Sequence, residues 1–246
     1  MTNFIVVTIF TAVIGGFGWA VLKGHEIKRR RDGERKVLAH SMGWSYAGER
    51  DGNVDYRFAG DTGGVAWQMW YDPDRGAKSP TPRAYWHCDN LQTQRLSLVV
   101  LGRKRYQLES GTVGRVLMGV VAGVAEVMTG AGGKVDKAEF YEGAVEVTGL
   151  LPSFRERFAV AVAPDMPRDW VDPQLQSLLL RWPGGGNSRF KGQDAVEITL
   201  SELGLRITVQ RMPQDTACWR HLAQLGEHVA QRLVQAGAQA TARAAA

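Results

Sequence analysis

The first hydrophobic run of the chain is unbroken: Phe4–Leu22, nineteen residues, has no charged side chain and is followed directly by the basic stretch Lys23–Lys36. In an α-helix such a run extends about 28 Å, close to the thickness of the hydrocarbon core of a bilayer. We therefore expect a transmembrane anchor with a basic flank at residues 1–27. Two alternatives are a buried soluble helix and a cleaved signal peptide. The run is too long for a typical signal, and Met1–Asn3 lacks a positive charge, although Gly18–Ala20 offers a small-x-small triplet.

Beyond residue 43 the pattern changes to an alternation of apolar and polar positions. It is clearest in one run of apolar residues at every second position: Val65, Trp67, Met69 and Tyr71. This period is typical of antiparallel strands with one face in the core, so Trp67 is expected to be buried and Trp70 to lie on the opposite face. The region 28–150 is therefore expected to be mainly β. Further strands are predicted at Gly43–Tyr46, Val54–Phe58, Leu96–Leu101 and Phe140–Leu150.

Residues 112–130 show the helical period instead. Their large apolar side chains fall within a sector of about 120° when placed at 100° per residue; they are Leu117, Val120, Val121, Val124, Val127 and Met128. This amphipathic helix is too short to span a bilayer, and we expect it to pack on the sheet. Docking on the membrane surface or on a partner helix is the alternative.

The last third of the chain, residues 151–236, predicts a β-α-β-β-α module. Alanines alternate with Phe158, Val160 and Val162, which gives this strand a second, small face suited to helix packing. Asp172-Pro173 has the residue types of a helix cap and first helical position. The remaining elements are a helix to Trp182, strands at Val196–Leu200 and Leu205–Val209, and a helix at about Asp215–Val234. The alanine-rich residues 237–246 are expected to form a disordered tail. The fold class is therefore α+β, with antiparallel sheet and packed helices.

The net charge of +5 is concentrated near the predicted anchor. Residues 23–36 hold seven Lys and Arg against three Asp and Glu, whereas the rest of the chain is almost balanced. A nucleic-acid-binding surface would spread basic residues over the folded body, so we do not expect one. Basic residues are retained on the cytoplasmic side of a membrane. We therefore expect the inner membrane as the location, with the N-terminus outside, the C-terminal domain in the cytoplasm, and anionic lipid headgroups near Lys28–Lys36.

Candidate chemistry is sparse. Cys88 and Cys218 are the two cysteines, and they lie in no metal-ligand pattern or disulfide framework. His87 precedes Cys88, but neighbours on a strand point to opposite faces, so His87 cannot activate the thiol. Asp72 and Asp74 flank a proline in a predicted turn.

His221 and His228, seven residues apart on the last helix, lack the spacing of a metal-binding pair and are expected to be partly solvated. Cys218 falls on the apolar stripe of the same helix and is expected in the core. The glycine-rich Gly130–Val135 does not match a phosphate-binding loop. No catalytic residue, metal ligand or cofactor site is predicted.

The order of features resembles that of uncharacterised single-pass bacterial membrane proteins. It comprises the apolar span, the basic flank, the strand start Gly43–Tyr46, the Trp67 strand after Gly63-Gly64, and the β-α-β-β-α end. The resemblance implies no catalytic residue. We expect an interaction or accessory protein with a possible protein partner. The alternatives are a membrane-associated hydrolase using Asp72, Asp74 or His87, and a binder of a small hydrophobic ligand between the sheet and the Gly111–Gly133 helix.

Overall fold

The computed structural model describes the backbone of residues 2–48, 54–74, 81–111, 137–183 and 195–244, and the side chains of these residues apart from 2–21, 138 and 237–244. Within these ranges the chain forms one nine-stranded sheet in the order β1-β2-β3-β4-β9-β8-β5-β7-β6. Neighbouring strands are antiparallel throughout. The strands are β1 (Ser45–Ala47), β2 (Arg57–Thr62), β3 (Val65–Asp72), β4 (Arg83–Cys88), β5 (Leu98–Gly102), β6 (Val145–Glu146), β7 (Phe158–Val162), β8 (Val196–Ser201) and β9 (Gly204–Gln210).

The described helices are α1 (Thr2–Met42), α2 (Arg103–Ser110), α4 (Lys137–Gly143), α5 (Pro152–Arg157), α6 (Pro173–Leu180) and α8 (Thr216–Ala244). The predicted α+β class is confirmed, and β7-α6-β8-β9-α8 has the predicted β-α-β-β-α order. The two regions 28–150 and 151–236 contribute to the same sheet, because β4 pairs with β9 and β5 lies between β8 and β7.

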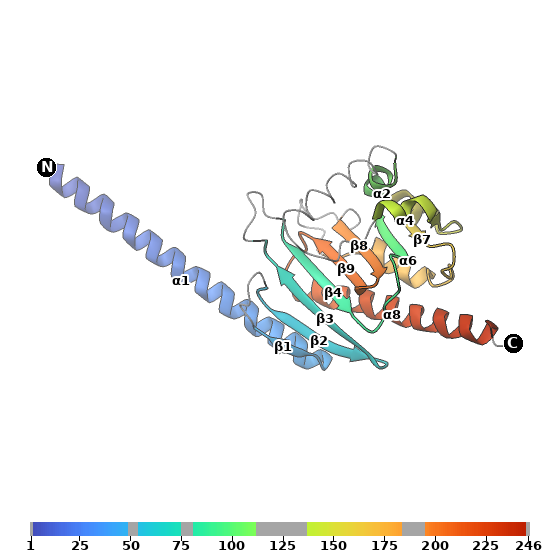
Figure 1. The fold of residues 1–246 in the computed structure, drawn as a ribbon. Coiled ribbons are helices and arrows are strands. Elements are labelled where there is room, and N and C mark those ends of the chain that lie inside the picture. The colour runs from blue at the N-terminus through green and yellow to red at the C-terminus, as the bar shows by residue number, and fades with distance from the viewer. Residues whose placement is uncertain (1, 49–53, 75–80, 112–136, 184–194, 245–246) are drawn as a thin grey trace.

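One face of the sheet, the core face, packs against α8, α6 and the end of α1 (Figure 1). The burial of β3 alternates along its whole length, and Trp67 and Met69 point into this core. The predicted register of β3 is therefore confirmed. The helix α8 lies close against the sheet at Gly226, where a Cβ atom would stand 2.3 Å from the indole of Trp86. Glycine at this position therefore lets the helix lie directly on the tryptophan ring.

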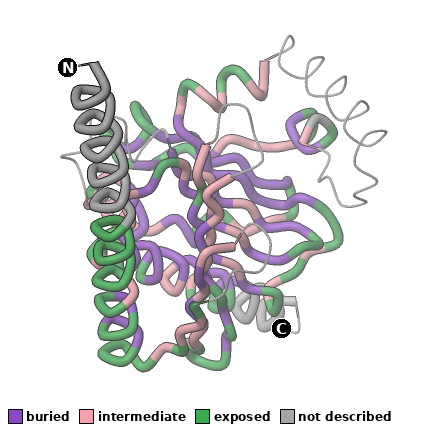
Figure 2. The backbone as a smooth tube through the Cα atoms, turned by 90° about the vertical axis from the view of Figure 1, so that its left-hand side faces the viewer, coloured by how far each residue is buried: buried purple, intermediate pink, exposed green. Residues whose placement is uncertain are grey.

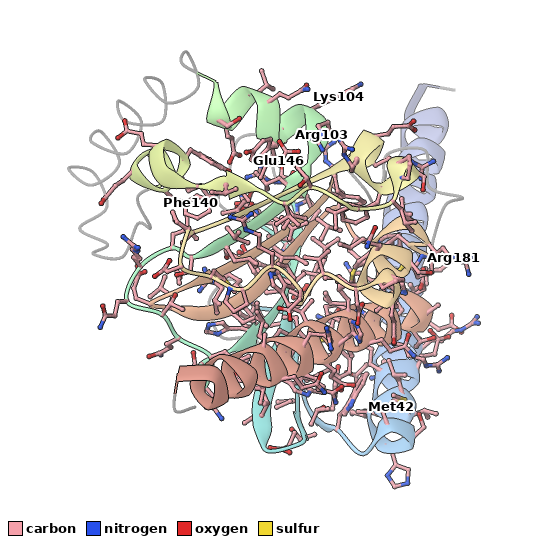
Figure 3. All side chains as sticks on the ribbon, turned by 90° about the vertical axis from the view of Figure 1, so that its right-hand side faces the viewer. Met42, Arg103, Lys104, Phe140, Glu146 and Arg181 are labelled. Atoms are coloured by element: carbon pink, nitrogen blue, oxygen red, sulfur yellow. The ribbon has the colours of Figure 1, made fainter. Side chains whose placement is uncertain are left out.

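The opposite face, the outer face, has a smaller apolar cluster over β5 and β7. Val99, Leu101 and Ala161 pack there beneath Phe140 and Tyr141 of α4. This confirms that the alanine side of β7 receives a helix. The helix α2 is tied to β6 at the same edge: Arg103 Nη1 donates to Glu146 Oε1 at 2.6 Å, and the two side chains lie together in Figure 3.

The end of α1 is attached to the body of the fold. The guanidinium of Arg35 is buried and lies 3.6 Å from the centre of the Tyr56 ring, while its Nη2 donates to Gln214 Oε1 at 2.7 Å. One turn earlier, Asp32 accepts a hydrogen bond from the hydroxyl of Tyr46. Before these contacts, residues 22–31 are exposed around the helix (Figure 2). The helix therefore projects from the body as a continuous rod.

The predicted span Phe4–Leu22 is part of the backbone of α1, but its side chains before Leu22 lie outside the description. Among the described residues, no helix has both the length and the apolar character needed to cross a membrane.

Two sequence predictions need correction, and two fall outside the described residues. The strand predicted at Phe140–Leu150 is wrong over its first part, where α4 forms. Phe140 and Tyr141 are neighbours in the chain and both pack in the outer-face cluster, which a helix allows and a strand with alternating side chains does not. The strand is limited to Val145–Glu146, which pairs with β7, and the Val147 N–H donates to Val160 O of β7 at 2.9 Å. The tail expected to be disordered is helical as far as Ala244, since alanine and glutamine favour helix and no proline follows Val234. The amphipathic helix expected at 112–130 and the loop Gly130–Val135 lie outside the described residues.

Candidate interaction surface

Aromatic and basic side chains gather on the outer face of strands β2, β3, β4 and β9. The register places them in two rows across the sheet. The first row is Arg57, Trp70 and Tyr85, on β2, β3 and β4. The second row is Gln68, His87 and Arg206, on β3, β4 and β9. We call this set the open face: Arg57, Gln68, Trp70, Tyr85, His87 and Arg206. Gln68 is exposed, and the other five are half-buried.

The rings on the open face hold one another in place. Trp70 and Tyr85 stack at 5.0 Å between ring centres with only 20° between their planes. The His87 ring meets Trp70 edge-on at 6.0 Å. The Nε2 atom of His87 lies 2.6 Å from the carbonyl oxygen of Leu203 and 3.3 Å from Asp89 Oδ1, so His87 is oriented by the β8–β9 turn. The result is a flat, fixed aromatic platform, the kind of surface that loses little side-chain entropy on binding.

The charges around this platform are predominantly positive. Arg57 Nη1 donates to Gln68 Oε1 at 3.1 Å, and the buried Nε atoms of Arg57 and Arg206 have no hydrogen-bond partner among the described residues. The carboxylates of β3 and its flanking hairpin lie at strand ends and are engaged there. Asp61 accepts from the backbone N–H of Gly64, and Asp72 accepts from that of Asp74. The open face therefore presents the guanidinium groups of Arg57 and Arg206 next to rings, with Asp89 beside His87 at its edge.

The candidate catalytic residues do not converge. His87 is half-buried on the open face, whereas Cys88 is 1% exposed on the core face, as strand alternation predicts. Asp72 and Asp74 act in the turn after β3, where Asp74 has a positive φ of 54° and its Oδ2 accepts from the backbone N–H of Thr81. Burial raises the pKa of the Cys88 thiol, which makes it a poorer nucleophile.

The histidines and the second cysteine of α8 have structural contacts. The Nε2 atom of His221 lies 2.8 Å from the carbonyl oxygen of Leu178, and that of His228 lies 2.9 Å from Asp172 Oδ1. Asp172 also caps α6 by accepting from the backbone N–H of Leu175, which confirms the predicted cap. Both histidines are partly solvated as expected, and Cys218 is fully buried. Among the described residues no group of histidine, cysteine and acidic side chains is arranged to hold a metal ion.

Comparisons with protein-family models, curated proteins and solved structures found no match to this chain.

Sequence reasoning missed a buried ionic cluster that borders the open face. Lys137 of α4 and Arg105 of α2 both bind Glu197 of β8, with Arg105 Nη2 2.8 Å from Glu197 Oε2. Both basic residues also bind Glu109, which accepts a further hydrogen bond from Tyr141. The charges are balanced and each carboxylate has several donors. We therefore regard the cluster as the attachment of α2 and α4 to the sheet.

Burial raises the pKa of Glu197, but the adjacent Lys137 and Arg105 outweigh this effect and hold it below its ordinary value. A charged residue in an apolar strand is the available sequence signal: Glu197 interrupts Val196 and Ile198. Its partners are distant in the sequence and could not be identified from it.

Proposed function

We propose that this chain is an interaction protein anchored in the bacterial inner membrane by Phe4–Leu22, with its folded body in the cytoplasm and an acidic protein partner bound on the open face. The partner surface is the part of the proposal that the geometry supports best. The single observation that carries it is the fixed Trp70–Tyr85 platform flanked by Arg57 and Arg206.

The residues of the open face suit a protein partner. Tryptophan, tyrosine and arginine contribute most to binding at protein interfaces, because rigid rings lose little entropy and guanidinium groups form charge-assisted bonds. The planar guanidinium groups of Arg57 and Arg206 favour carboxylate groups as the ligands, because they can bind them through two parallel hydrogen bonds. An acidic segment that carries an apolar or aromatic side chain would match both features.

The anchor is supported by the sequence and by the way α1 joins the body. The apolar run is long enough to span a bilayer, and the basic residues follow it. Residues 22–31 of α1 are exposed, so Lys28, Arg29 and Arg31 can face anionic headgroups, while Arg30 pairs with Glu34. The buried Arg35 fixes the helix to the sheet. A rigid connection of this kind would hold the body at a set distance and orientation below the membrane.

The two alternative functions have less support. A hydrolase would need polar groups that converge in one pocket, and Asp72, Asp74 and His87 are each held in separate turn or strand contacts. A ligand site between the sheet and the helix expected at 112–130 lies outside the described residues.

The location is tested with reporters fused after Ala246 of the full chain. We expect a reporter that is active only in the cytoplasm to work, and a periplasm-specific reporter to remain inactive. A working periplasmic reporter would show that the C-terminus lies outside the cytoplasm and that the distribution of positive charge does not predict the orientation of this chain.

The partner surface is tested by affinity purification of the full chain from membranes solubilised in mild detergent. The double variant Arg57→Glu/Arg206→Glu reverses the charge of the open face, and Arg168→Glu/Arg95→Glu makes the same change at exposed positions away from it. An acidic protein should co-purify with wild type and with the control pair and be lost with the first pair. The proposal is wrong if the co-purifying proteins are the same for all three chains, provided that circular dichroism shows each to be folded.

A further inference from the structure

The direction of α1 relative to the sheet determines where the open face lies. The helix α1 is continuous from Thr2 to Met42, and Figure 1 shows it leaving the body as a single rod. Leu38 and Ala39, near its end, are buried in the cluster on the core face. A helix packed on a sheet has its axis roughly parallel to the plane of the sheet. The open face, on the other side of the sheet, therefore looks sideways from the rod.

Strand β1 runs back along α1 towards the predicted span. Just after the helix ends, the backbone N–H of Trp44 donates to the carbonyl oxygen of Ala39 at 2.8 Å. Two residues later, the hydroxyl of Tyr46 donates to Asp32, which lies about two turns earlier in α1. The strand and the helix are therefore antiparallel. Because its strands pair antiparallel to one another, the sheet has its strands along the direction of the rod.

The strand register gives the level of the open face along the rod. Strand β2 pairs with β1 beside Tyr46, and Arg57, Trp70 and Tyr85 follow in one row across β2, β3 and β4. This first row therefore lies at about the level of Asp32. The second row is two residues further along the strands, about 7 Å more distant from the predicted span.

The first row is close to the proposed membrane. Asp32 follows Leu22, the last residue of the predicted span, by ten residues, which is about 15 Å of helix. The headgroup layer takes up about 5–8 Å of this distance. A tilt of about 20°, which is usual for membrane helices, changes the height by less than about 1 Å. The first row therefore lies within about 10 Å of the headgroups.

The junction between α1 and the body holds this height. The buried guanidinium of Arg35 packs on the ring of Tyr56 and donates to Gln214. No proline interrupts residues 2–42, so the helix has no kink site of that kind. The open face is thus held sideways, just below the headgroups. A protein that binds it meets it from the side, within the layer next to the membrane.

We propose that the acidic partner of the open face is itself an integral membrane protein, which docks an acidic segment next to its own membrane span on the cytoplasmic side. This inference rests on the proposed function, that is, on the anchor Phe4–Leu22 and on an acidic protein partner. Arg57 and Arg206 give the face the complementary charge. Confinement to one membrane raises the effective concentration of such a partner. Acidic residues next to a span are compatible with a cytoplasmic location, because they contribute little to topology.

The test is photocrosslinking in cells that carry the full chain. A photoreactive amino acid is placed at Gln68, which is exposed on the open face. Two variants insert fourteen residues between Arg29 and Arg30, so that the basic residues Lys23–Arg29 stay next to the span. The helical variant inserts Glu, Ala and Lys residues, which lengthen the rod by about 21 Å. The flexible variant inserts Gly and Ser residues, which let the body return to the membrane.

The wild-type chain should form an adduct with an acidic protein that has a membrane span of its own, identified by mass spectrometry. The helical insertion should lower the yield of this adduct at least about tenfold, because it moves the open face away from the segment next to the partner's span. The flexible insertion should keep the yield within about threefold of wild type, since the effective concentration falls only slowly with linker length.

The inference is overturned if the helical insertion keeps the wild-type yield, because the partner is then not held near the membrane. Loss of the adduct with both insertions also overturns it, because the rigid height is then not what matters. An adduct protein without a membrane span would identify a soluble partner, with the same consequence. The proposed function fails by a different result, in which the wild-type chain gives no adduct that Arg206→Glu removes.

Discussion

Replacing Trp67 with alanine tests the packing of the core face most severely. The Trp67 side chain is 2% exposed, meets Trp44 edge-on at 5.3 Å and stacks with Trp86 at 6.2 Å. Its Nε1 atom donates to Thr62 Oγ1 at 3.1 Å, and its ring fills the space over Gly60, where a Cβ would stand 2.5 Å away. No neighbouring side chain can occupy that volume without leaving its own position.

The magnitude follows from the buried area. A tryptophan buries 150–250 Å², which at about 25 cal/mol per Å² corresponds to about 4–6 kcal/mol as an upper bound. Measured substitutions of buried tryptophan by alanine cost about 3–5 kcal/mol, and we expect Trp67→Ala to lie in this range. Trp70→Ala is the matched control, because Trp70 is half-buried on the other face of the same strand. Its loss should cost about 1–2 kcal/mol.

The assay is urea unfolding of the full chain in mild detergent, followed by near-ultraviolet circular dichroism. The difference between the two variants is the informative quantity, since both remove one indole from β3. Equal losses of unfolding free energy, or a larger loss for Trp70→Ala, would refute the register of β3 and the assignment of the two faces.

Three further predictions concern the same fold. Gly226→Ala should lower the unfolding free energy by about 1–3 kcal/mol, although alanine is the better helix former, because its Cβ would overlap Trp86. The control, Gln224→Ala at an exposed position of α8, should change the unfolding free energy by less than about 0.5 kcal/mol. A Gly226→Ala chain that is more stable than wild type would contradict the close approach of α8. The pKa of Glu197 is held below its ordinary value, so ionised Glu197 stabilises the fold above its unfolded pKa, and this contribution is lost as the pH falls through the folded pKa. Glu197→Gln should therefore reduce stability at neutral pH and make stability decline less steeply in acid. A urea midpoint that depends on pH in the same way in the variant and the wild type would refute this. Burial, together with the adjacent Asp215, raises the pKa of Cys218 to about 12, and burial also raises the pKa of Cys88. Iodoacetamide at pH 8 should therefore alkylate both thiols only after unfolding. Rapid labelling of the folded chain, detected by mass spectrometry, would contradict this.

The sequence was most informative where burial follows a strict period. The alternation in β3 identified the core side of Trp67 correctly, because one face of that strand packs on α8 and the other does not. The alanines of β7 predicted a helix on their side, and α4 lies there. The Asp172-Pro173 pair predicted the start of α6, because a cap depends only on local residues.

The failures occurred where the period was short or interrupted. Two adjacent aromatic residues, Phe140 and Tyr141, fit either a strand with two covered faces or one turn of a helix, and only packing on Val99 and Leu101 decides between them. The short helices α2 and α5 lack an apolar stripe long enough to reveal them. Alanine-rich residues beyond Val234 gave no burial signal, yet their helix propensity extends α8.

The open face could not have been predicted from the sequence alone. Its residues come from four strands, and the pairing of His87 with Arg206 joins positions far apart in the chain. A shift of β9 by one residue in that register would send Arg206 to the core face. The same argument applies to the ionic cluster around Glu197, whose partners come from α2 and α4.

The most direct test of a membrane-held interaction protein is crosslinking in living cells. A photoreactive amino acid is placed at Gln68, which is exposed on the open face, and, as a matched position, at Val37, which is 70% exposed on α1. We predict that irradiation joins the residue-68 chain to one acidic protein in the membrane fraction, and that Arg206→Glu abolishes this adduct without affecting the membrane location. The chain with the photoreactive amino acid at position 37 should not form this adduct. An adduct that forms equally from both positions, or that survives Arg206→Glu, would contradict the account.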